Sequence, residues 1–237
     1  MVVKNQCPED KVARVRVLQI ARRFVRQEWG GTETVVLETS RRLLAGGMQT
    51  EVICPNALAN DDLETMGGVM IRRFGYFYPY FGLTANARNQ MDKKAGNLFS
   101  FSLMRYLERQ PAVDLVHLHT AKRLGGIGRY VARKRKIPYV VSLHGGCLDV
   151  PADESQQWTA PTRGAFEWGK ALGWWVGSRR VLEDADAIIC VGEGEYNAIR
   201  KEYPNHRVVH LPNGVDVDRF RSGDGKAFRE KFSLDSE

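Results

Sequence analysis

Two short segments of the sequence carry residue types suited to binding an anion or to catalysis, and the first is rich in glycine. Trp29-Gly30-Gly31-Thr32-Glu33 follows an apolar run over residues 15–20 and precedes a helical pattern of apolar residues. Adjacent glycines let a ligand approach the backbone closely. A helix that begins near Thr32 directs its unpaired N–H groups and its dipole at the same place. The segment therefore predicts a phosphate site, although a plain strand-to-helix turn has the same pattern.

The second segment places histidine at the ends of predicted strands. His119 lies near the end of the apolar run 114–120, and His144 follows the run 138–143 and precedes two glycines. Ligands of open α/β sheets bind at the carboxyl ends of the strands. A neutral imidazole there donates to an oxygen, and an imidazolium stabilises developing negative charge, so His144 is the catalytic candidate. A histidine that only satisfies hydrogen bonds in the core remains the alternative.

Aromatic and basic segments are further candidates for ligand contact. Residues 74–82 are rich in aromatic rings and are interrupted by proline and glycine. Aromatic side chains in loops line pockets for sugars or lipids, and a loop clamped onto the core has the same composition. The basic residues of 129–136 predict a solvated helix face or one that faces a membrane. Arg22, Arg23 and Arg26 are predicted either to meet phosphate or to be solvated.

These segments require a framework of alternating strands and helices. Apolar runs predict strands near residues 15–20, 50–54, 69–73, 114–120, 138–143, 187–191 and 207–211. Helical periodicity predicts helices over residues 32–45, 97–109, 125–136, 164–184 and 193–203, and residues 55–68 are predicted as loop. The tryptophans of residues 164–184 are assigned to the core, with a lid or an interfacial face as alternatives. This alternation predicts an α/β fold with a doubly wound, mostly parallel sheet and helices on both faces.

Composition narrows the class of protein. The chain has 237 residues, of which 43% are apolar, enough to form a packed core. It contains no apolar run of about 18 residues that would span a membrane, and its first residues lack the apolar core of a secretion signal. Its four cysteines are widely spaced and form no CxxC pair. Reduced thiols and a cytoplasmic location are therefore expected, rather than a zinc site or a disulfide framework.

The formal net charge of +7 favours anionic partners such as nucleotide phosphates or lipid head groups. Nucleic acid is disfavoured, because the basic residues are spread along the chain and no nucleic-acid-binding signature is present. The first turn lacks the GxGxxG pattern and no acidic residue is placed to bind a ribose, which disfavours a dehydrogenase. A P-loop enzyme is disfavoured because no GxxxxGK pattern is followed by Ser or Thr. No Asp-x-Asp metal site is recognised in the sequence, so no metal cofactor is expected.

Five segments, taken in order, resemble the N-terminal domain of family 4 retaining glycosyltransferases with the GT-B fold. They are residues 30–33, 114–119, 138–145, 187–193 and 211–220. The resemblance covers nearly the whole chain. It implies one Rossmann-like half of a GT-B fold over residues 14–216, after a flexible lead-in over residues 1–13. Residues 217–237 would then be the start of a linker towards a C-terminal domain.

The resemblance also implies roles for individual residues, some of them on the donor side. The donor diphosphate would lie against Gly30, Gly31 and Thr32. The donor sugar would contact His144 near the reacting carbon. The acceptor side would be formed by His119, Thr120, Lys122, Tyr78 and Tyr80. The crossing to the second domain would involve Asn213, Gly214 and Asp216.

The implied reaction transfers a hexosyl group from a nucleotide-sugar to a hydroxyl of a glycan or lipid-linked acceptor, with retention. It needs positive charge and helix dipoles to stabilise the diphosphate, and a water-poor cleft between two domains. The family's second domain would begin near residue 237, so this chain alone is expected to be nearly inactive. It is expected in the cytoplasm, with peripheral contact at the inner face of an anionic membrane.

Two other classes of protein stay open. One is a non-catalytic module whose basic and aromatic surface binds lipid or a partner protein. The other is half of a sugar-nucleotide epimerase, since such enzymes also use two Rossmann halves. The reading frame beyond Glu237 discriminates among them, because a basic residue and spaced glutamates on a helix there would favour the transferase.

Overall fold

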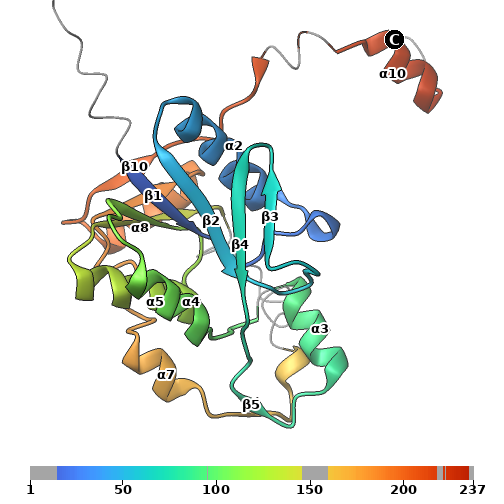
Figure 1. Cartoon of the computed structure of the whole chain (residues 1–237). Coiled ribbons are helices and arrows are strands. Elements are labelled where there is room, and N and C mark those ends of the chain that lie inside the picture. The colour runs from blue at the N-terminus through green and yellow to red at the C-terminus, as the bar shows by residue number, and fades with distance from the viewer. Residues whose placement is uncertain (1–14, 95, 146–159, 218–220, 222, 235–237) are drawn as a thin grey trace, which may run out of the picture.

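An eight-stranded sheet forms the centre of the molecule (Figure 1). The computed structural model describes residues 15–94, 96–145, 160–217, 221 and 223–234. The strands follow the order β10-β9-β7-β6-β1-β2-β4-β3, and all except β3 run parallel to their neighbours. The predicted α/β fold with a doubly wound, mostly parallel sheet is therefore confirmed. The predicted lead-in over residues 1–13 lies outside the described residues.

Each strand that the sequence predicts is present. The strands of the sheet are β1 (Arg16–Ile20), β2 (Gln49–Pro55), β3 (Leu63–Met66), β4 (Val69–Phe74), β6 (Leu115–Leu118), β7 (Tyr139–Leu143), β9 (Ala187–Cys190) and β10 (Val208–His210). Only β3 was not predicted, and the prediction of loop throughout residues 55–68 is wrong. This strand pairs antiparallel with β4 at the edge of the sheet, where short and largely exposed strands carry little apolar pattern.

The parallel strands lie in the order of a Rossmann sheet. If β3 is left out and the other strands are numbered in chain order, their order across the sheet is 3-2-1-4-5-6-7. The direction of the crossovers therefore reverses between β1 and β6. Ile20 at the end of β1 pairs with Leu118 at the end of β6. Ligands of such sheets bind outside the carboxyl ends of the strands at this reversal, which makes it the place to look for a site.

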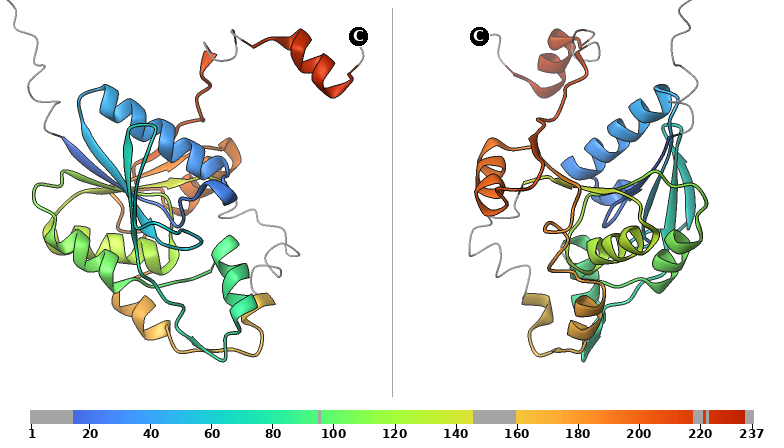
Figure 2. Two further views of the ribbon diagram at one scale, coloured as in Figure 1. Left: turned by 45° about the vertical axis from the view of Figure 1, so that its right-hand side comes forward. Right: turned by 90° about the vertical axis from the view of Figure 1, so that its left-hand side faces the viewer.

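Helices cover both faces of the sheet (Figure 2). The helix α2 (Gly31–Ala45) lies on one face, and α4 (Phe101–Arg109) and α5 (Lys122–Arg135) lie on the other. Successive strand residues point to opposite faces, so Val52 packs in the core beneath α2 and Ile53 packs in the core beneath α4 and α5. Burial of these apolar side chains is the main force that holds the layers together.

Helix α5 approaches the sheet closely at Gly128. A Cβ atom at this position would lie 2.5 Å from Cδ2 of Leu118 and 3.1 Å from Cδ1 of Ile20. A larger residue would push α5 away from β1 and β6. Helices α4 and α8 (Glu193–Glu202) confirm two further predictions, although α4 begins four residues later than the sequence indicated at residue 97.

The predicted long helix over residues 164–184 is wrong. This segment contains a short strand β8 (Phe166–Glu167), a short helix α7 (Lys170–Trp175) and then turns up to Asp184. Gly177 has a φ of +64°, which is a left-handed conformation that ends α7. The tryptophans of this segment are exposed, so their assignment to the core is also wrong.

The remaining elements lie outside the main sheet. A two-residue strand β5 (Tyr80–Phe81) pairs antiparallel with β8, and helix α3 (Ala85–Lys93) was not predicted because few of its residues are apolar. Two short 3-10 turns are η1 (Arg26–Glu28) and η2 (Ala160–Thr162). Helix α10 (Gly225–Phe232) stands apart from the sheet in both figures, within the range predicted as linker.

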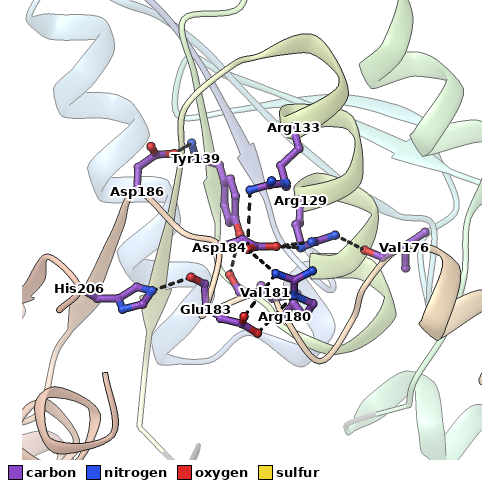
Figure 3. Close-up of polar contacts among 10 residues, drawn as sticks. All are labelled: Arg129, Arg133, Tyr139, Val176, Arg180, Val181, Glu183, Asp184, Asp186 and His206. Atoms are coloured by element: carbon purple, nitrogen blue, oxygen red, sulfur yellow. Dashed lines mark hydrogen bonds and ion pairs between the residues drawn. The ribbon is translucent and has the colours of Figure 1, made fainter. Parts of the chain in front are cut away.

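An ion-pair cluster fastens the turns after α7 onto α5. Figure 3 shows Arg129, Arg133 and Arg180 converging on Asp184. Nε of Arg129 donates to Oδ2 of Asp184 at 2.6 Å, and Nη1 of Arg129 donates to the carbonyl oxygen of Val176 at 3.2 Å. Arg129 is buried, so the prediction that it belongs to a solvated basic face is wrong. The exposed part of that face is formed by the residues that follow it.

None of the helices among the described residues is long and apolar enough to cross a bilayer. Cys54 and Cys190 are buried and are in no disulfide among the described residues, and Cys7 and Cys147 lie outside the described residues. Burial raises the pKa of the Cys54 thiol to about 12, so this group stays protonated and unreactive at neutral pH.

Candidate active site at the carboxyl edge of the sheet

A row of three hydrogen-bonded side chains crosses the carboxyl edge of the sheet from β7 to β1. Nδ1 of His119 lies 2.9 Å from Nε2 of His144, and Nε2 of His119 lies 2.6 Å from Oε1 of Gln19. Gln19 and His119 are buried, and His144 is partly buried. The structure therefore brings His119 and His144 together beside the end of β1, where the crossovers reverse.

Gln19 determines where the protons of this row lie. An amide oxygen only accepts hydrogen bonds, so Nε2 of His119 carries the proton. Burial, aided by the neighbouring histidines, holds the pKa of His119 well below its ordinary value. The neutral ring of His119 therefore accepts at Nδ1, and Nε2–H of His144 is the donor.

The free nitrogen of His144 is left as a hydrogen-bond acceptor. Burial lowers the pKa of His144, so its ring is neutral and Nδ1 carries no proton when Nε2 does. Nδ1 is buried and has no hydrogen-bond partner among the described residues. Because a buried unpaired acceptor is costly, a ligand hydroxyl or amide that donates to Nδ1 would be stabilised there.

A second buried histidine lies behind the row. Nε2 of His117 lies 2.7 Å from Oγ of Ser142, and its ring centroid lies 4.1 Å from that of His119. Burial, together with the charge that His144 would carry, lowers the pKa of His117 to about 4. The three histidines contact one another rather than converge on one point. Accordingly, the described residues contain no group of three His, Cys, Asp or Glu side chains placed to hold a metal.

The low pKa of His117 predicts a pH dependence of stability. Between pH 6.5 and about 4 the unfolded chain binds a proton at this residue and the folded chain does not. The free energy of unfolding is therefore expected to fall with falling pH, by about 1.4 kcal/mol per pH unit for this residue. Urea unfolding at several pH values measures the slope. The lowered pKa values of His119 and His144 also make the free energy of unfolding fall with falling pH.

The control for this prediction is His117→Asn, which can still bond Ser142 but does not titrate in this window. Its free energy of unfolding should depend on pH less steeply than that of the unsubstituted chain. Equal slopes would mean that His117 is protonated as easily in the folded state as in the unfolded state.

The glycine segment lies at the same edge, at the start of α2. The N–H of Gly30 donates to Oε2 of Glu33 at 3.0 Å, and Arg23 lies 3.5 Å from the other oxygen of this carboxylate. The backbone N–H groups of Gly31 and Thr32 have no acceptor within the part of the chain that the structure describes. These two donors and the helix dipole therefore face whatever binds at the end of β1.

Gly31 is not required by the backbone or by packing. Its φ is not positive, and a Cβ atom placed on it would meet nothing within 4 Å. By contrast, a Cβ atom on Gly30 would lie 3.1 Å from Oε2 of Glu33. The space beside Gly31 is therefore open, as a ligand site at this helix end requires.

Arg22 and Arg23, which follow β1, bind groups of the protein itself. Arg22 donates to the carbonyl oxygen of Asp92 at 3.0 Å and to the hydroxyl of Tyr78 at 3.2 Å. Arg23 donates to carbonyl oxygens at the same end of α3, among them that of Lys93. Both side chains are partly buried, so the predicted alternative of solvation does not hold for these two residues. They neutralise the C-terminal end of α3, where helix dipoles favour cations.

The predicted acceptor-side residues divide into two groups. Thr120 and Lys122 follow β6 and lie at the carboxyl edge beside His119. Tyr78 is buried, and its hydroxyl donates to Oδ1 of Asp92 at 2.9 Å. Tyr80 belongs to β5, opposite Glu167 of β8. Thr120 and Lys122 therefore lie close to His119 along the chain, whereas Tyr78 lies in the core and Tyr80 in the β5–β8 ribbon.

The predicted interdomain residues lie on an exposed stretch that leaves the sheet. Asn213, Gly214 and Asp216 follow β10, and the chain continues from them towards α10 (Figure 1). Their exposure is compatible with a crossing to another domain, which stays a prediction.

Sequence reasoning missed two polar residues of the site. Gln19 is the single uncharged polar residue of β1, and that isolated position in an apolar strand was a usable signal. Glu195 lies in the first turn of α8, and its Oε2 accepts from the N–H of Gly145 at 3.3 Å. It thereby holds the backbone that follows His144. Nothing distinguishes Glu195 in the sequence from the other charged residues of α8.

Comparison with known proteins identifies a matching family. The model of the family described as "Glycosyltransferase Family 4" matches residues 29–219. D-inositol 3-phosphate glycosyltransferase 1 of Catenulispora acidiphila is 26% identical over 211 residues, which cover 86% of this chain and 46% of the relative. Its glycosyltransferase 2 is 27% identical over 215 residues, with the same coverage. The chain thus spans about half the length of the curated relatives it matches.

Two solved structures have a similar backbone fold. Sucrose-phosphate synthase from Thermosynechococcus elongatus is 15% identical, with a TM-score of 0.45, over 92% of this chain and 99% of that one. The catalytic domain of starch synthase IV from Arabidopsis thaliana, bound to ADP and acarbose, is 12% identical, with a TM-score of 0.47, over 90% of this chain and 54% of that one.

Proposed function

The chain belongs to glycosyltransferase family 4, and we propose that it forms the N-terminal half of a retaining hexosyltransferase. The reaction would move a hexosyl group from a nucleotide-sugar to a hydroxyl of a glycan or lipid-linked acceptor. One observation carries this proposal: the row His144–His119–Gln19 and the open N-terminal end of α2 both lie at the carboxyl edge of the sheet, and the row crosses the point where the crossovers reverse. A second domain would complete the donor pocket.

The N-terminal end of α2 would hold the diphosphate of the donor. Negative charge grows on the diphosphate as its bond to the sugar breaks. The unpaired N–H groups of Gly31 and Thr32, together with the helix dipole, would stabilise that charge more in the transition state than in the ground state. Open space beside Gly31 would let the phosphates approach the backbone.

His144 would orient the sugar. Its unprotonated Nδ1 would accept a hydrogen bond from a sugar hydroxyl, while His119 and Gln19 hold the ring in that tautomer. His144 follows β7, which lies two strands from β1, a separation of about 10 Å at the usual strand spacing. A hexose joined to a diphosphate bound at α2 can bridge that distance. Thr120 and Lys122 would face the acceptor from the neighbouring strand end.

Gly31→Ala tests the diphosphate assignment. Because the new methyl group meets nothing in the folded chain, the free energy of unfolding should be unchanged or raised by up to about 1 kcal/mol. The methyl group would occupy space needed by the diphosphate, so the KM for the donor should rise about tenfold, measured on the protein that includes its second domain. Glu38→Ala, farther along α2, is the control and should leave KM unchanged. A KM unaffected by Gly31→Ala would remove this residue from the donor site.

The proposed activity is tested on the product of the complete reading frame that contains this chain. The protein is incubated with a panel of nucleotide-sugars, and release of the nucleoside diphosphate and the anomeric configuration of the product are measured. Transfer with retention supports the proposal. Interconversion of the nucleotide-sugar without transfer would point to an epimerase, and neither binding nor turnover of any donor would point to a non-catalytic module.

The proposed location is the cytoplasm, at a membrane that carries the acceptor. The net charge of +7 supports attraction to an anionic surface. Exposed aromatic side chains, among them Trp174 and Phe81, support contact with lipid.

A further inference from the structure

A continuous network of aromatic rings extends from the β5–β8 ribbon to α7. Ring centroids lie 6.3 Å apart between Phe81 and Phe166, and 6.0 Å apart between Phe81 and Trp168. From Trp168 the contacts continue through the half-buried Phe77 to Phe101, at 5.9 and 5.8 Å. They then reach Trp175, which lies 6.4 Å from Phe101. The exposed rings of this network, with Trp174, are called the aromatic surface below: Phe81, Phe101, Phe166, Trp168, Trp174 and Trp175.

The aromatic surface is unusually open to solvent. Trp174 is 87% exposed, Phe166 is 67% exposed and Phe81 is 64% exposed. Large apolar rings that touch one another at the surface lose favourable burial, and such patches on soluble proteins mark interaction sites. Exposed rings that come from separate segments and contact one another are therefore expected to be covered by a partner.

A positively charged pocket adjoins this surface. It has a volume of about 990 Å³ and lies between α5, α7 and the turns that follow α7. Its lining includes five cations and one carboxylate: Arg123, Arg129, Lys170, Arg179, Arg180 and Glu167. Trp174 and Trp175 also line it, so the pocket and the aromatic surface are continuous.

The cations of the pocket differ in whether a described carboxylate pairs with them. Arg123 pairs with Glu167, and both Arg129 and Arg180 pair with Asp184. Within the described ranges no ion pair involves Lys170 or Arg179, and both residues are exposed. The pocket therefore offers two cations that no carboxylate of the described residues pairs with, and exposed tryptophans line the same pocket.

We infer that the aromatic surface and this pocket form the face by which the protein docks on an anionic phospholipid bilayer. Lys170 and Arg179 would meet lipid phosphates, and the tryptophan and phenylalanine rings would enter the boundary between head groups and acyl chains. Tryptophan is enriched at that boundary, and paired aromatic and basic residues are the usual composition of peripheral binding faces. The inference rests on the proposed membrane location and names the surface responsible for it.

The position of this face suits an enzyme that acts at a membrane. The ribbon β5–β8 and α7 lie at the opposite end of the molecule from α10 (Figures 1 and 2). The chain beyond β10 thus leads away from the docking face. Docking would also leave the N-terminal end of α2 uncovered, because the pocket lies on the side of the sheet that carries α5.

The docking face is tested by sedimentation with vesicles of phosphatidylcholine, with and without phosphatidylglycerol. The protein should sediment with the anionic vesicles, and Trp emission should shift to shorter wavelength on binding. Raising the salt from about 0.1 M to about 0.5 M should weaken binding, because salt screens exposed charges. The double variant Lys170→Gln/Arg179→Gln should lower the partition coefficient on the order of 20-fold at low salt.

Variants of the rings and matched controls complete the test. Trp174→Ser should lower the partition coefficient about tenfold even at high salt, because its effect is apolar. Met70→Ser and Lys201→Gln, which are exposed on β4 and α8, should bind like the unsubstituted protein. The assignment would be overturned if Trp174→Ser and the double variant bound vesicles as well as the unsubstituted protein. It would also be overturned if the control variants lost as much binding as these two variants. No binding to any vesicle would also overturn it and would favour a protein partner.

Donor turnover separates this inference from the proposed function. Release of nucleoside diphosphate in solution should be unchanged in Trp174→Ser, since this side chain is 87% exposed and is not part of the proposed donor site. Lost vesicle binding with intact release supports the docking face. If the unsubstituted protein and its variants bind vesicles but none of them releases nucleoside diphosphate, the docking face stands and the proposed transferase activity does not.

Discussion

Asp184→Ala is expected to lower the free energy of unfolding by about 3–5 kcal/mol. Asp184 forms an ion pair with Arg129. The side chain of Asp184 is 9% exposed and that of Arg129 is 10% exposed. Arg180 and Arg133 approach the same carboxylate at 3.2 and 3.7 Å (Figure 3). Removal of the carboxylate would leave a buried guanidinium without its counter-charge, among two other cations. Urea unfolding followed by circular dichroism measures the loss.

Glu183→Ala is the matched control for this prediction. Glu183 pairs with the same Arg180, but both side chains are more than half exposed, at 53% and 54%. Solvent screens such a pair, so its loss should cost between about 0 and 1 kcal/mol. Similar losses in the two variants would show that the cluster at Asp184 is solvated and contributes no more than a surface pair.

The cluster has a consequence for the pocket beside α7. Arg129 holds the carbonyl oxygen of Val176 as well as Asp184, and it thereby fixes the turns that follow α7 against α5. We expect Asp184→Ala to loosen these turns first. Hydrogen exchange should rise in residues 176–184 before it rises in the strands of the sheet, because local openings begin where packing is weakest.

His144→Ala is expected to lower turnover by about 10²-fold or more in the protein that includes its second domain. The substitution removes the acceptor Nδ1 that would orient the donor sugar, and it removes the donor of the 2.9 Å hydrogen bond to His119. Because orientation matters most in the transition state, kcat should fall more than KM rises. Initial rates of nucleoside diphosphate release over a range of donor concentrations measure both constants.

His210→Ala is the control for His144. His210 is exposed on β10, and its ring stacks on Tyr196 at 5.5 Å, away from the row of hydrogen-bonded side chains. Its replacement should leave kcat unchanged. The unfolding curve of His144→Ala should show an intact fold, so that a loss of turnover reports on chemistry. Turnover equal to that of the unsubstituted protein would remove His144 from the reacting centre.

The order of strands and helices could be predicted because it depends on local pattern. Runs such as residues 138–143 are buried on both faces, so their apolar character is nearly continuous and shows in any single sequence. Prediction failed where burial is partial. The edge strand β3 and the helix α3 have few buried residues, and the glycine-interrupted residues 164–184 had helical spacing without helical backbone.

The carboxyl edge as the location of a site could also be predicted, since parallel strands bring their carboxyl ends together. His144 and His119 follow different strands, and the sheet order places them side by side. Their mutual hydrogen bond could not be predicted, nor could the contact of His119 with Gln19, which lies 100 residues away. Such pairs depend on strand order, and strand order is set by long-range packing.

The sequence by itself determined the α/β class, the positions of the main strands, and the glycine and histidine segments at their ends, because all of these follow from the local spacing of residue types. Only the tertiary structure decided which polar groups meet. It placed Arg129 on Asp184, turned Arg22 and Arg23 to the end of α3, and left Nδ1 of His144 without a partner among the described residues. The reason is physical: a buried charge or imidazole takes its state from neighbours that folding brings together, and those neighbours are distant along the chain.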